Sequence, residues 1–302
     1  MNSTTRKIIL FLFLAGITGS TTSFNTRPPQ KHTLHTIIID PGHGGFDPGT
    51  HGLFSKEKDV TLAISLKLGK AIEKAFPDIK VVFTRTTDVM PGNASTLHEG
   101  LIARADLANK SKGDLFLCIH ANSNSHPAGS YEVKEVTGYK WVKKGKKKKK
   151  VPVYKSYRVK NTKKGTTTLI WKAMWGEYKG SVINQQDMGE ENMGDSIAPP
   201  FNMNSPEARI RAQLYEKKYF ANSTYFATLV ENEFVKAGRH SDGVAQREVG
   251  IWVLEATGMP SVLIETGFLT NEEEEKYLNS KEGQNEIVGN IVDALRIYQD
   301  SQ

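Results

Sequence analysis

The sequence predicts an α/β fold: one domain around a twisted, mostly parallel but mixed sheet, with helices on both faces and one insertion. Short apolar segments rich in Val and Ile alternate with longer amphipathic segments along most of the chain, which is typical of α/β domains. The segment 114–120 is apolar at nearly every position, as expected of a central strand covered on both faces. The chain of 302 residues, 38% of them hydrophobic, is long enough to bury such a core.

The first half of this domain is predicted to alternate strands with helices. The strand over 35–39 ends abruptly in the tetrapeptide Asp-Pro-Gly-His, where proline and glycine permit a tight turn. The helix after it carries apolar residues at helical spacing from Val60 to Ala75 and stops before Pro77. In chain order, the elements expected here are strand 35–39, helix 57–76, strand 79–88, helix 96–110, strand 114–120 and strand 129–139.

Between about residues 140 and 204 the periodic pattern stops, and this range is predicted to be an insertion. Its first part is rich in lysine and is expected to form an exposed hairpin, because lysines discourage pairing with other sheet edges. Its second part contains the acidic stretch "DMGEENMGD", residues 187–195, which is a candidate regulatory segment.

The charge of the chain is concentrated in the same region. Thirteen of the 40 basic residues lie between Lys140 and Lys164, with no acidic residue among them. The formal net charge of +7 therefore comes from one segment, and the rest of the mature chain is mildly acidic. This distribution argues against nucleic-acid binding, which would depend on that segment alone.

The periodic pattern returns at residue 205 with a long amphipathic helix. Ser205 is a suitable N-cap and Gly238 suits the C-terminal end, so the helix is predicted over 205–238. The elements expected after it are strand 251–254, strand 261–264 and a final helix over 282–299. The last helix carries an apolar stripe at helical spacing, which indicates that it covers one face of the sheet.

The N-terminus has the layout of a secretory signal peptide. Two basic residues precede an apolar stretch from Ile8 to about Ile17, and small residues follow it. We therefore predict a signal peptide over 1–23, a linker over 24–34 and the folded domain over 35–300. A retained membrane anchor is the alternative, which the shortness of the apolar stretch disfavours. The mature protein is expected to be exported.

Chemically active side chains follow three of the predicted strands. His43 follows the first strand, His120 ends the apolar central strand, and Glu265 ends the last strand. Glu57 lies at the start of the first helix. Because ligands of open α/β sheets bind outside the carboxyl ends of the strands, these four side chains are expected to meet at one rim of the sheet.

Two imidazoles and one carboxylate form the protein part of a catalytic zinc site, with a position left for water. The same ligands can hold non-haem iron(II), but an exported protein without evident redox groups favours zinc. A second carboxylate would then serve as general base. Taken singly, each residue has an ordinary explanation, because strand-end histidines often face solvent and the helix dipole favours an N-terminal glutamate. Their joint occurrence in this order indicates a site.

Several motifs together resemble the zinc-dependent N-acetylmuramoyl-L-alanine amidases of the amidase-3 type. They are "IIIDPGHGGFDPG", "KEKDVTLAISLKL", "VVFTRTTD", "ARADLAN", "LFLCIHAN" and "PSVLIETGFLTN". The resemblance covers about residues 36–125 and 243–298. It implies a single α/β catalytic domain and a peptidoglycan hydrolase. The bond cleaved would be the amide between the lactyl group of N-acetylmuramic acid and L-alanine of the stem peptide, by means of a zinc-activated water.

The resemblance also implies roles for individual residues. Carried over position by position, His43, Glu57 and His120 match the ligands of one zinc ion, and Glu265 matches the catalytic glutamate. The peptidoglycan substrate implies a periplasmic or cell-envelope location. In some members of the family, a helix at the place of the insertion covers the active site until an activator protein removes it. Residues 187–195 are the candidate for such a lid.

Other partners and functions remain open at this point. The lysine-rich segment is expected to be mainly solvated, with a weak electrostatic contact to anionic envelope polymers as the alternative. The protein is expected to be a monomer. A non-catalytic peptidoglycan-binding protein and a zinc peptidase acting within the stem peptide are the competing functions. The first is disfavoured because all four chemical positions are filled.

Overall fold

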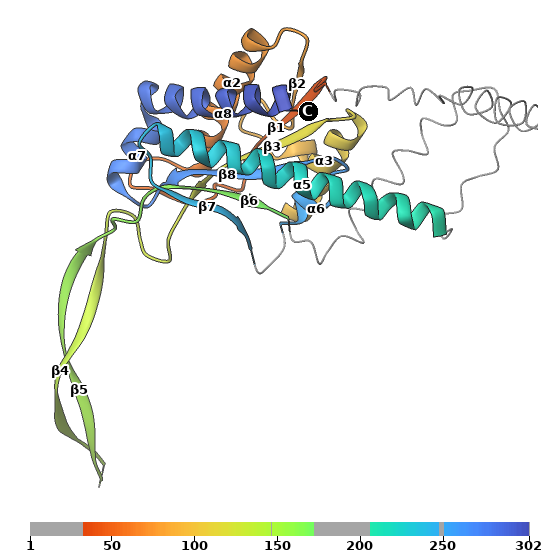
Figure 1. Cartoon of the computed structure of the whole chain (residues 1–302). Coiled ribbons are helices and arrows are strands. Elements are labelled where there is room, and N and C mark those ends of the chain that lie inside the picture. The colour runs from red at the N-terminus through yellow and green to blue at the C-terminus, as the bar shows by residue number, and fades with distance from the viewer. Residues whose placement is uncertain (1–32, 146, 172–205, 248–250, 302) are drawn as a thin grey trace, which may run out of the picture. The chain divides into compact units, whose positions relative to one another are not determined.

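The computed structural model describes residues 33–145, 147–171, 206–247 and 251–301. Six strands form one mixed sheet in the spatial order β2-β1-β3-β8-β6-β7 (Figure 1). Their bounds are β1 (Thr36–Pro41), β2 (Lys80–Phe83), β3 (Leu115–Asn122), β6 (Thr166–Ile170), β7 (Ser241–Gln246) and β8 (Ser261–Phe268). The first four in this spatial order are parallel, whereas β6 runs antiparallel to β8 and pairs in parallel with β7. The predicted α/β fold with a mostly parallel, mixed sheet is confirmed.

Helices cover both faces of the sheet, also as predicted. The helices α2 (Glu57–Ala75), α5 (Pro206–Lys236) and α8 (Lys281–Ser301) pack on one face, and α3 (Leu97–Lys110) and α6 (Trp252–Glu255) on the other. Successive strand residues point to opposite faces, so in β1 Ile37 and Ile39 join the first core cluster while Ile38 joins the second. All three side chains are fully buried. The sheet is therefore the middle of three layers.

Sequence signals at the helix ends explain where the helices begin. The Thr96 hydroxyl accepts a hydrogen bond from the backbone N–H of Glu99, and the Glu99 carboxylate accepts one from the backbone N–H of Thr96, which makes a capping box at the start of α3. A short helix, α7 (Glu272–Asn279), starts after the N-cap residue Asn271. A 3-10 turn, η1 (Pro91–Asn93), precedes α3.

The lysine-rich hairpin exists and is longer than predicted. The strands β4 (Ser130–Lys144) and β5 (Lys147–Lys160) pair antiparallel with each other in a separate two-stranded sheet (Figure 1). The segment 129–139, predicted as a strand of the domain, instead forms the first two thirds of β4 from residue 130 on. It alternates polar and apolar residues like a half-buried strand, so the sequence alone does not distinguish the two placements.

Part of the range predicted as an insertion belongs to the main sheet. The strand β6 lies inside the range 140–204, yet it pairs with both β7 and β8, and its five residues are all buried. Its sequence, Thr-Thr-Thr-Leu-Ile, is rich in β-branched residues, which favour strands although three of them are polar. The predicted signal peptide 1–23, most of the linker 24–34 and the candidate lid 187–195 lie outside the described residues.

The strand predicted over 251–254 is wrong, because residues 252–255 form the short helix α6. Four consecutive apolar residues fit a buried strand and a buried helical turn equally well. Here Val253 and Leu254 are buried in the second core cluster beside residues of α3. Besides β6 and the 3-10 turn η1, two elements were not predicted, β7 and α7. The first has few apolar residues because it is the edge strand of the sheet, and the second opens with four glutamates.

Candidate active site

The turn after β1 carries His43 at the rim of the sheet. Gly44 and Asp47 exchange backbone hydrogen bonds of 3.0 and 3.1 Å, which closes the turn, and His43 adopts a positive φ of 59°. The Asp47 carboxylate lies 2.7 Å from Nδ1 of His43. That contact makes Nδ1 the protonated nitrogen and leaves Nε2 available to accept a proton or bind a metal.

Glu57 is the first residue of α2 and is almost completely buried, with 3% of its surface exposed. Its Oε2 accepts a hydrogen bond of 2.9 Å from the backbone N–H of Thr50, and its Oε1 accepts one of 3.1 Å from Ala121. The carboxylate also lies at the N-terminus of the helix, where the dipole favours negative charge. These contacts fix the orientation of both oxygens.

His43, Glu57 and His120 converge as the sequence predicts. The Oε1 atom of Glu57 lies 3.1 Å from Nε2 of His43 and 2.8 Å from Nδ1 of His120. Among the described residues this is the one group of three His, Cys, Asp or Glu side chains whose ligand atoms lie within 4.8 Å of one another. A zinc ion binds such atoms at about 2.0–2.2 Å. Donors about 3 Å apart can share one ion at that bond length, so the residues present fit zinc.

The ionisation of the cluster favours a cation at its centre. Burial by itself would raise the pKa of Glu57, but the hydrogen bonds and charges of His120 and His43 hold that pKa far below its usual value. Burial likewise opposes the charging of His43, yet contacts with Glu57 and Asp47 raise its pKa above the usual value. A buried carboxylate that stays ionised here needs positive charge beside it, which a divalent metal would supply.

Glu265 lies next to this cluster on the adjacent strand. It is paired in register with His120 of β3 on one side and with Thr167 of β6 on the other. Its Oε2 atom is buried and has no hydrogen-bond partner among the described residues. Burial raises the pKa of Glu265 to about 7, with the charge of His120 opposing the rise and that of Glu57 adding to it. A carboxyl group whose pKa lies near 7, beside a cluster suited to a metal, can both accept and donate a proton at neutral pH.

A cavity of about 210 Å³ opens beside the two imidazoles. Its apolar wall is formed by Met90, Leu97, Leu101 and Val253, which come from the segment before α3, from α3 itself and from α6. The two cluster histidines line it as well, together with Asp40, Asp47, Arg104 and Cys118. The cavity thus combines an apolar wall with a small number of polar groups, as ligand sites commonly do.

Two buried arginines hold the turn that carries His43. Arg104 of α3 forms an ion pair with Asp40 and donates hydrogen bonds to the carbonyls of Pro41 and His43. Arg85 donates to the carbonyls of Pro41 and Gly42, at 3.1 and 2.7 Å. Both arginines are less than 5% exposed. Their hydrogen bonds to the backbone carbonyls of residues 41–43 hold His43 in position.

Arg104→Ala is expected to lower the free energy of unfolding by about 3–5 kcal/mol, because it leaves the Asp40 carboxylate buried without its charged partner. Urea unfolding followed by circular dichroism measures this loss. Lys110→Ala is the matched control, since Lys110 is on the same helix and makes only an exposed ion pair of 3.5 Å with Asp106. Equal unfolding midpoints for the two variants would contradict a structural role for Arg104.

Glu275 of α7 supports the segment just before Glu57. Its two oxygens accept hydrogen bonds of 2.8–2.9 Å from the backbone N–H groups of Leu53, Phe54 and Ser55. Sequence reasoning missed this residue and also missed Asp47. A run of four glutamates at a helix start is usually solvated, so only the structure shows that Glu275 is fully buried and that Glu274 beside it is also buried. Asp47 had a weak signal, namely its place four residues after His43.

Position 49 must be glycine because the side chains of His43 and Glu57 lie directly against it. A Cβ atom there would lie 2.6 Å from Cδ2 of His43 and 2.7 Å from Oε2 of Glu57, and the φ of Gly49 is +63°. Gly49→Ala is therefore expected to weaken zinc binding about 10–100-fold, as changes beside metal ligands do. Competition with a chromophoric chelator measures the affinity. Gly289→Ala is the control, because a Cβ at Gly289 meets nothing within 4 Å; an affinity unchanged by Gly49→Ala contradicts the prediction.

The remaining histidines near the domain surface are not part of the cluster. His51, His98, His126 and His240 are all exposed. His126 stacks on Tyr131 with ring centroids 3.7 Å apart. These contacts are ordinary surface interactions.

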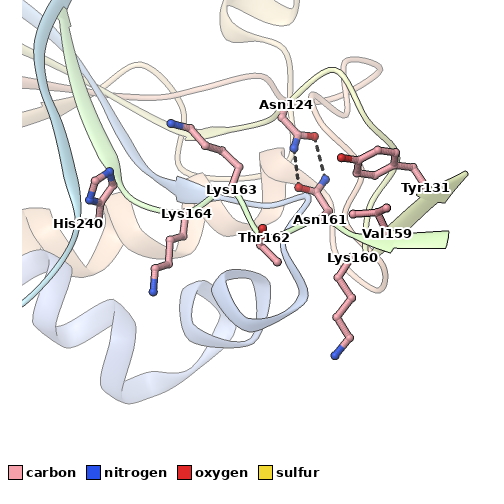
Figure 2. Close-up of a pocket in the computed structure, with 9 residues that line it drawn as sticks. All are labelled: Asn124, Tyr131, Val159, Lys160, Asn161, Thr162, Lys163, Lys164 and His240. Atoms are coloured by element: carbon pink, nitrogen blue, oxygen red, sulfur yellow. Dashed lines mark hydrogen bonds between the residues drawn. The ribbon is translucent and has the colours of Figure 1, made fainter. Parts of the chain in front are cut away.

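A second cavity, of about 450 Å³, lies where the hairpin strands begin and end (Figure 2). Asn124 and Asn161 exchange amide hydrogen bonds across it, and Lys163 and Lys164 extend to opposite sides. The ammonium of Lys163 is already paired with Asp242, at 2.8 Å. Asn124, Asn161 and Lys163 therefore already have polar partners.

The fold and the site together define the class of protein. A mixed α/β sheet brings two histidines and one glutamate from the ends of β1 and β3 and the start of α2 into a cluster suited to a divalent metal, with a second glutamate on the adjacent strand. The family model described as N-acetylmuramoyl-L-alanine amidase, of the amidase-3 type, matches residues 37–296. The chain belongs to this family.

Known proteins of the same description match most of the chain. N-acetylmuramoyl-L-alanine amidase AmiC of Escherichia coli O6:H1 is 29% identical over 268 residues, which cover 87% of this chain and 52% of that protein. The probable amidase AmiB of Haemophilus influenzae is 27% identical, with 96% and 56% covered. This chain thus spans about half the length of these two relatives.

Solved structures agree with the fold. The crystal structure of N-acetylmuramoyl-L-alanine amidase from Clostridium difficile 630 superposes with a TM-score of 0.55 at 25% identity, over 90% of this chain and 100% of that one. The CwlD amidase from Clostridioides difficile, solved in complex with the GerS lipoprotein, gives the same TM-score at 22% identity, over 89% of this chain and 100% of that one. In the part of the chain that the structure describes, no helix is long and apolar enough to cross a bilayer.

Proposed function

We propose that this chain is a zinc-dependent N-acetylmuramoyl-L-alanine amidase that acts on peptidoglycan. The bond it cleaves is the amide between the lactyl group of N-acetylmuramic acid and L-alanine of the stem peptide. The observation that carries the proposal is the convergence of His43, Glu57 and His120 on one point, with the unpartnered Oε2 of Glu265 on the adjacent strand. The choice of substrate follows from the description of the family to which the chain belongs.

In this proposal His43 Nε2, Glu57 Oε1 and His120 Nδ1 hold one zinc ion. When bound, zinc supplies a Lewis acid that polarises the amide carbonyl and lowers the pKa of water. Asp47 keeps the proton of His43 on Nδ1, so that Nε2 is the nitrogen that faces the Glu57 carboxylate. The turn residues and Arg104 then hold His43 at that position.

Glu265 moves the proton. Its carboxylate accepts a proton from the water that attacks the carbonyl carbon, as the new C–O bond forms. The same proton is then returned to the alanine nitrogen as the C–N bond breaks, so the products are a free lactyl carboxylate and a peptide with a free amino group. The buried, unpartnered Oε2 is the atom suited to this role, because no competing donor among the described residues occupies it.

Incubation of the zinc-loaded protein with purified peptidoglycan tests the proposed function. Mass analysis of the products is expected to show intact stem peptides with a free L-alanine amino group, beside peptide-free glycan. Peptides cut between their own residues would identify a peptidase instead, and the absence of products would identify a binding protein. Chelator-treated protein is the control, with zinc added back to restore the reaction.

We also propose that the protein works outside the cytoplasm, in the cell envelope or periplasm, and that a partner protein regulates it. The signal-like sequence over 1–23 supports the location, and so does the chain's similarity to N-acetylmuramoyl-L-alanine amidases, because the proposed substrate, peptidoglycan, lies outside the cytoplasm. The complex of CwlD with a lipoprotein supports the idea of a partner. Fractionation of cells that express the chain tests the first proposal, and recovery of partners cross-linked to the full-length protein tests the second.

A further inference from the structure

The β4–β5 hairpin has two different faces, and a bulge separates them. Val136 pairs with Tyr154, whereas the next partners are Gly138 and Val153, so Thr137 is one extra residue in β4. Paired residues of an antiparallel ladder point to the same side. The bulge therefore brings Tyr139, beyond it on β4, to the same face as Tyr154.

We name this side the aromatic face: the paired positions Val136–Tyr154, Tyr139–Pro152 and Trp141–Lys150. Its three aromatic side chains are exposed, with 62% of Tyr139, 68% of Trp141 and 54% of Tyr154 accessible to solvent. Exposed aromatic rings gathered on one face are uncommon unless they bind something, because burying them releases ordered water.

Cations flank the aromatic rings on the same face. Toward the tip are Lys150 and the pair Lys143–Lys148. Toward the base are Lys134 and then the pair Glu132–Arg158, in which the two charges offset each other. The Lys150 ammonium lies 4.7 Å from the centre of the Tyr139 ring. The face thus offers flat apolar rings with several cations toward the tip and Lys134 toward the base.

From this arrangement we infer that the aromatic face binds the carboxylate-bearing glycan of peptidoglycan as an extended polymer, apart from the catalytic site. The C–H faces of sugar rings pack on Tyr139, Trp141 and Tyr154, and the flanking lysines pair with carboxylates of the stem peptides. The inference rests on the proposed function in one respect, since that function names the polymer. It adds a second binding region, formed by residues that the catalytic site does not use.

The order of residues along the hairpin favours a polymer over a lipid bilayer. The two pairs nearest the tip, Lys143–Lys148 and Lys144–Lys147, consist of lysines only, and the aromatic residues lie behind them. A hairpin that enters a membrane by its tip has the reverse order, with apolar residues at the tip and lysines behind. Rings placed along the length of a strand instead suit a chain that lies across them.

Co-sedimentation with intact, insoluble peptidoglycan tests the inference on the full-length protein. The Glu265→Gln background keeps the polymer intact during the measurement. The triple variant Tyr139→Ala, Trp141→Ala, Tyr154→Ala is expected to bind about tenfold more weakly. The matched control changes three exposed apolar residues of the opposite face, Val142→Ala, Val153→Ala and Tyr157→Ala, and is expected to bind within about twofold of the background protein.

The lysines have their own matched pair of variants. Lys143→Gln, Lys148→Gln and Lys150→Gln remove three charges from the aromatic face, and Lys140→Gln, Lys149→Gln and Lys155→Gln remove three from the opposite face. Net charge is equal in the two, so a non-specific attraction weakens equally in both. The first set is expected to weaken binding several-fold more than the second. Peptidoglycan whose carboxylates have been amidated is expected to abolish that difference.

The outcomes separate this inference from the proposed function. The inference is overturned if the aromatic-face triple variant and its control bind peptidoglycan equally well. It is also overturned if the three rings are needed for binding to phosphatidylglycerol vesicles but not for binding to peptidoglycan. Hydrolysis of a small soluble muramyl peptide, measured with Glu265 restored, is expected to be unchanged by the aromatic-face substitutions. Ring-dependent binding without any hydrolysis by the unsubstituted protein would reject the proposed function and leave the inference standing.

Discussion

Glu265→Gln is expected to reduce kcat on peptidoglycan about 10³-fold and to leave zinc content unchanged. Glutamine has nearly the same size as glutamate, but it cannot accept a proton, and general-base catalysis contributes about 10²–10⁴ to a rate. Because Glu265 lies on β8 and the metal cluster is formed by β1, α2 and β3, its loss leaves all three proposed ligands in place. Product release and metal analysis on the same sample measure both effects.

A control and a pH profile sharpen this test. Glu272→Gln changes an exposed glutamate that pairs only with Lys276, at 2.6 Å, and is expected to keep full activity. Since burial raises the pKa of Glu265 to about 7, the ionised form that accepts a proton is lost as the pH falls through that value. A bound cation lowers this pKa, so the activity is expected to fall on the acid side at or below about pH 7. Full activity of Glu265→Gln would refute the proton-transfer role.

His43→Ala is expected to abolish zinc binding and activity together. The substitution removes one of three ligands and leaves Glu57, whose pKa is held far below its usual value, without one of the two imidazoles that stabilise its charge. Protein-bound zinc is expected to fall from about one ion per chain to near zero, because structural and catalytic sites alike need their full ligand set. Metal analysis after dialysis measures the loss.

His126→Ala is the matched control for this substitution. It also replaces a histidine with alanine, but His126 is exposed and stacks on Tyr131. It is expected to retain zinc and activity. Asp47→Ala is expected to fall between the two, with zinc affinity reduced about 10–100-fold, because Asp47 orients the imidazole of His43 without binding the metal. Zinc retained by His43→Ala would show that His43 is not a ligand.

The convergence of the cluster could be predicted from the sequence because the topology of the sheet determines it. Parallel strands end at the same edge, so residues after β1 and β3 meet there however far apart they are in the chain. His43 follows β1, whereas His120 and Glu265 lie toward the C-terminal ends of β3 and β8, and the apolar runs of these strands are easily recognised in the sequence. Glu57 is predicted for a related reason, since the helix that returns from the sheet edge starts close to it.

Other parts of the site could not be predicted because their signals are not local. Glu275 accepts hydrogen bonds from backbone groups more than 200 positions away, and a run of four glutamates gives no sign that two of them, Glu274 and Glu275, are buried. The strand β6 lacks a continuous apolar run, since its buried threonines bind the carboxylate of Glu231 through their hydroxyl groups. The helix α6 was mistaken for a strand because four residues are too few to show a period.

The register of β3 against β8 has a consequence for how this catalytic centre can change over time. His120 and Glu265 are paired on neighbouring strands, about 4.8 Å apart. The backbone hydrogen bonds between β3 and β8 therefore fix the separation of the proposed metal ligand from the proposed proton acceptor. A slip of one residue would turn Glu265 to the far side of the sheet. The loops that follow these strands do not determine that separation. They are free to lengthen, even into an arm such as the β4–β5 hairpin, which begins eight residues after β3 ends at Asn122 and is followed by β6.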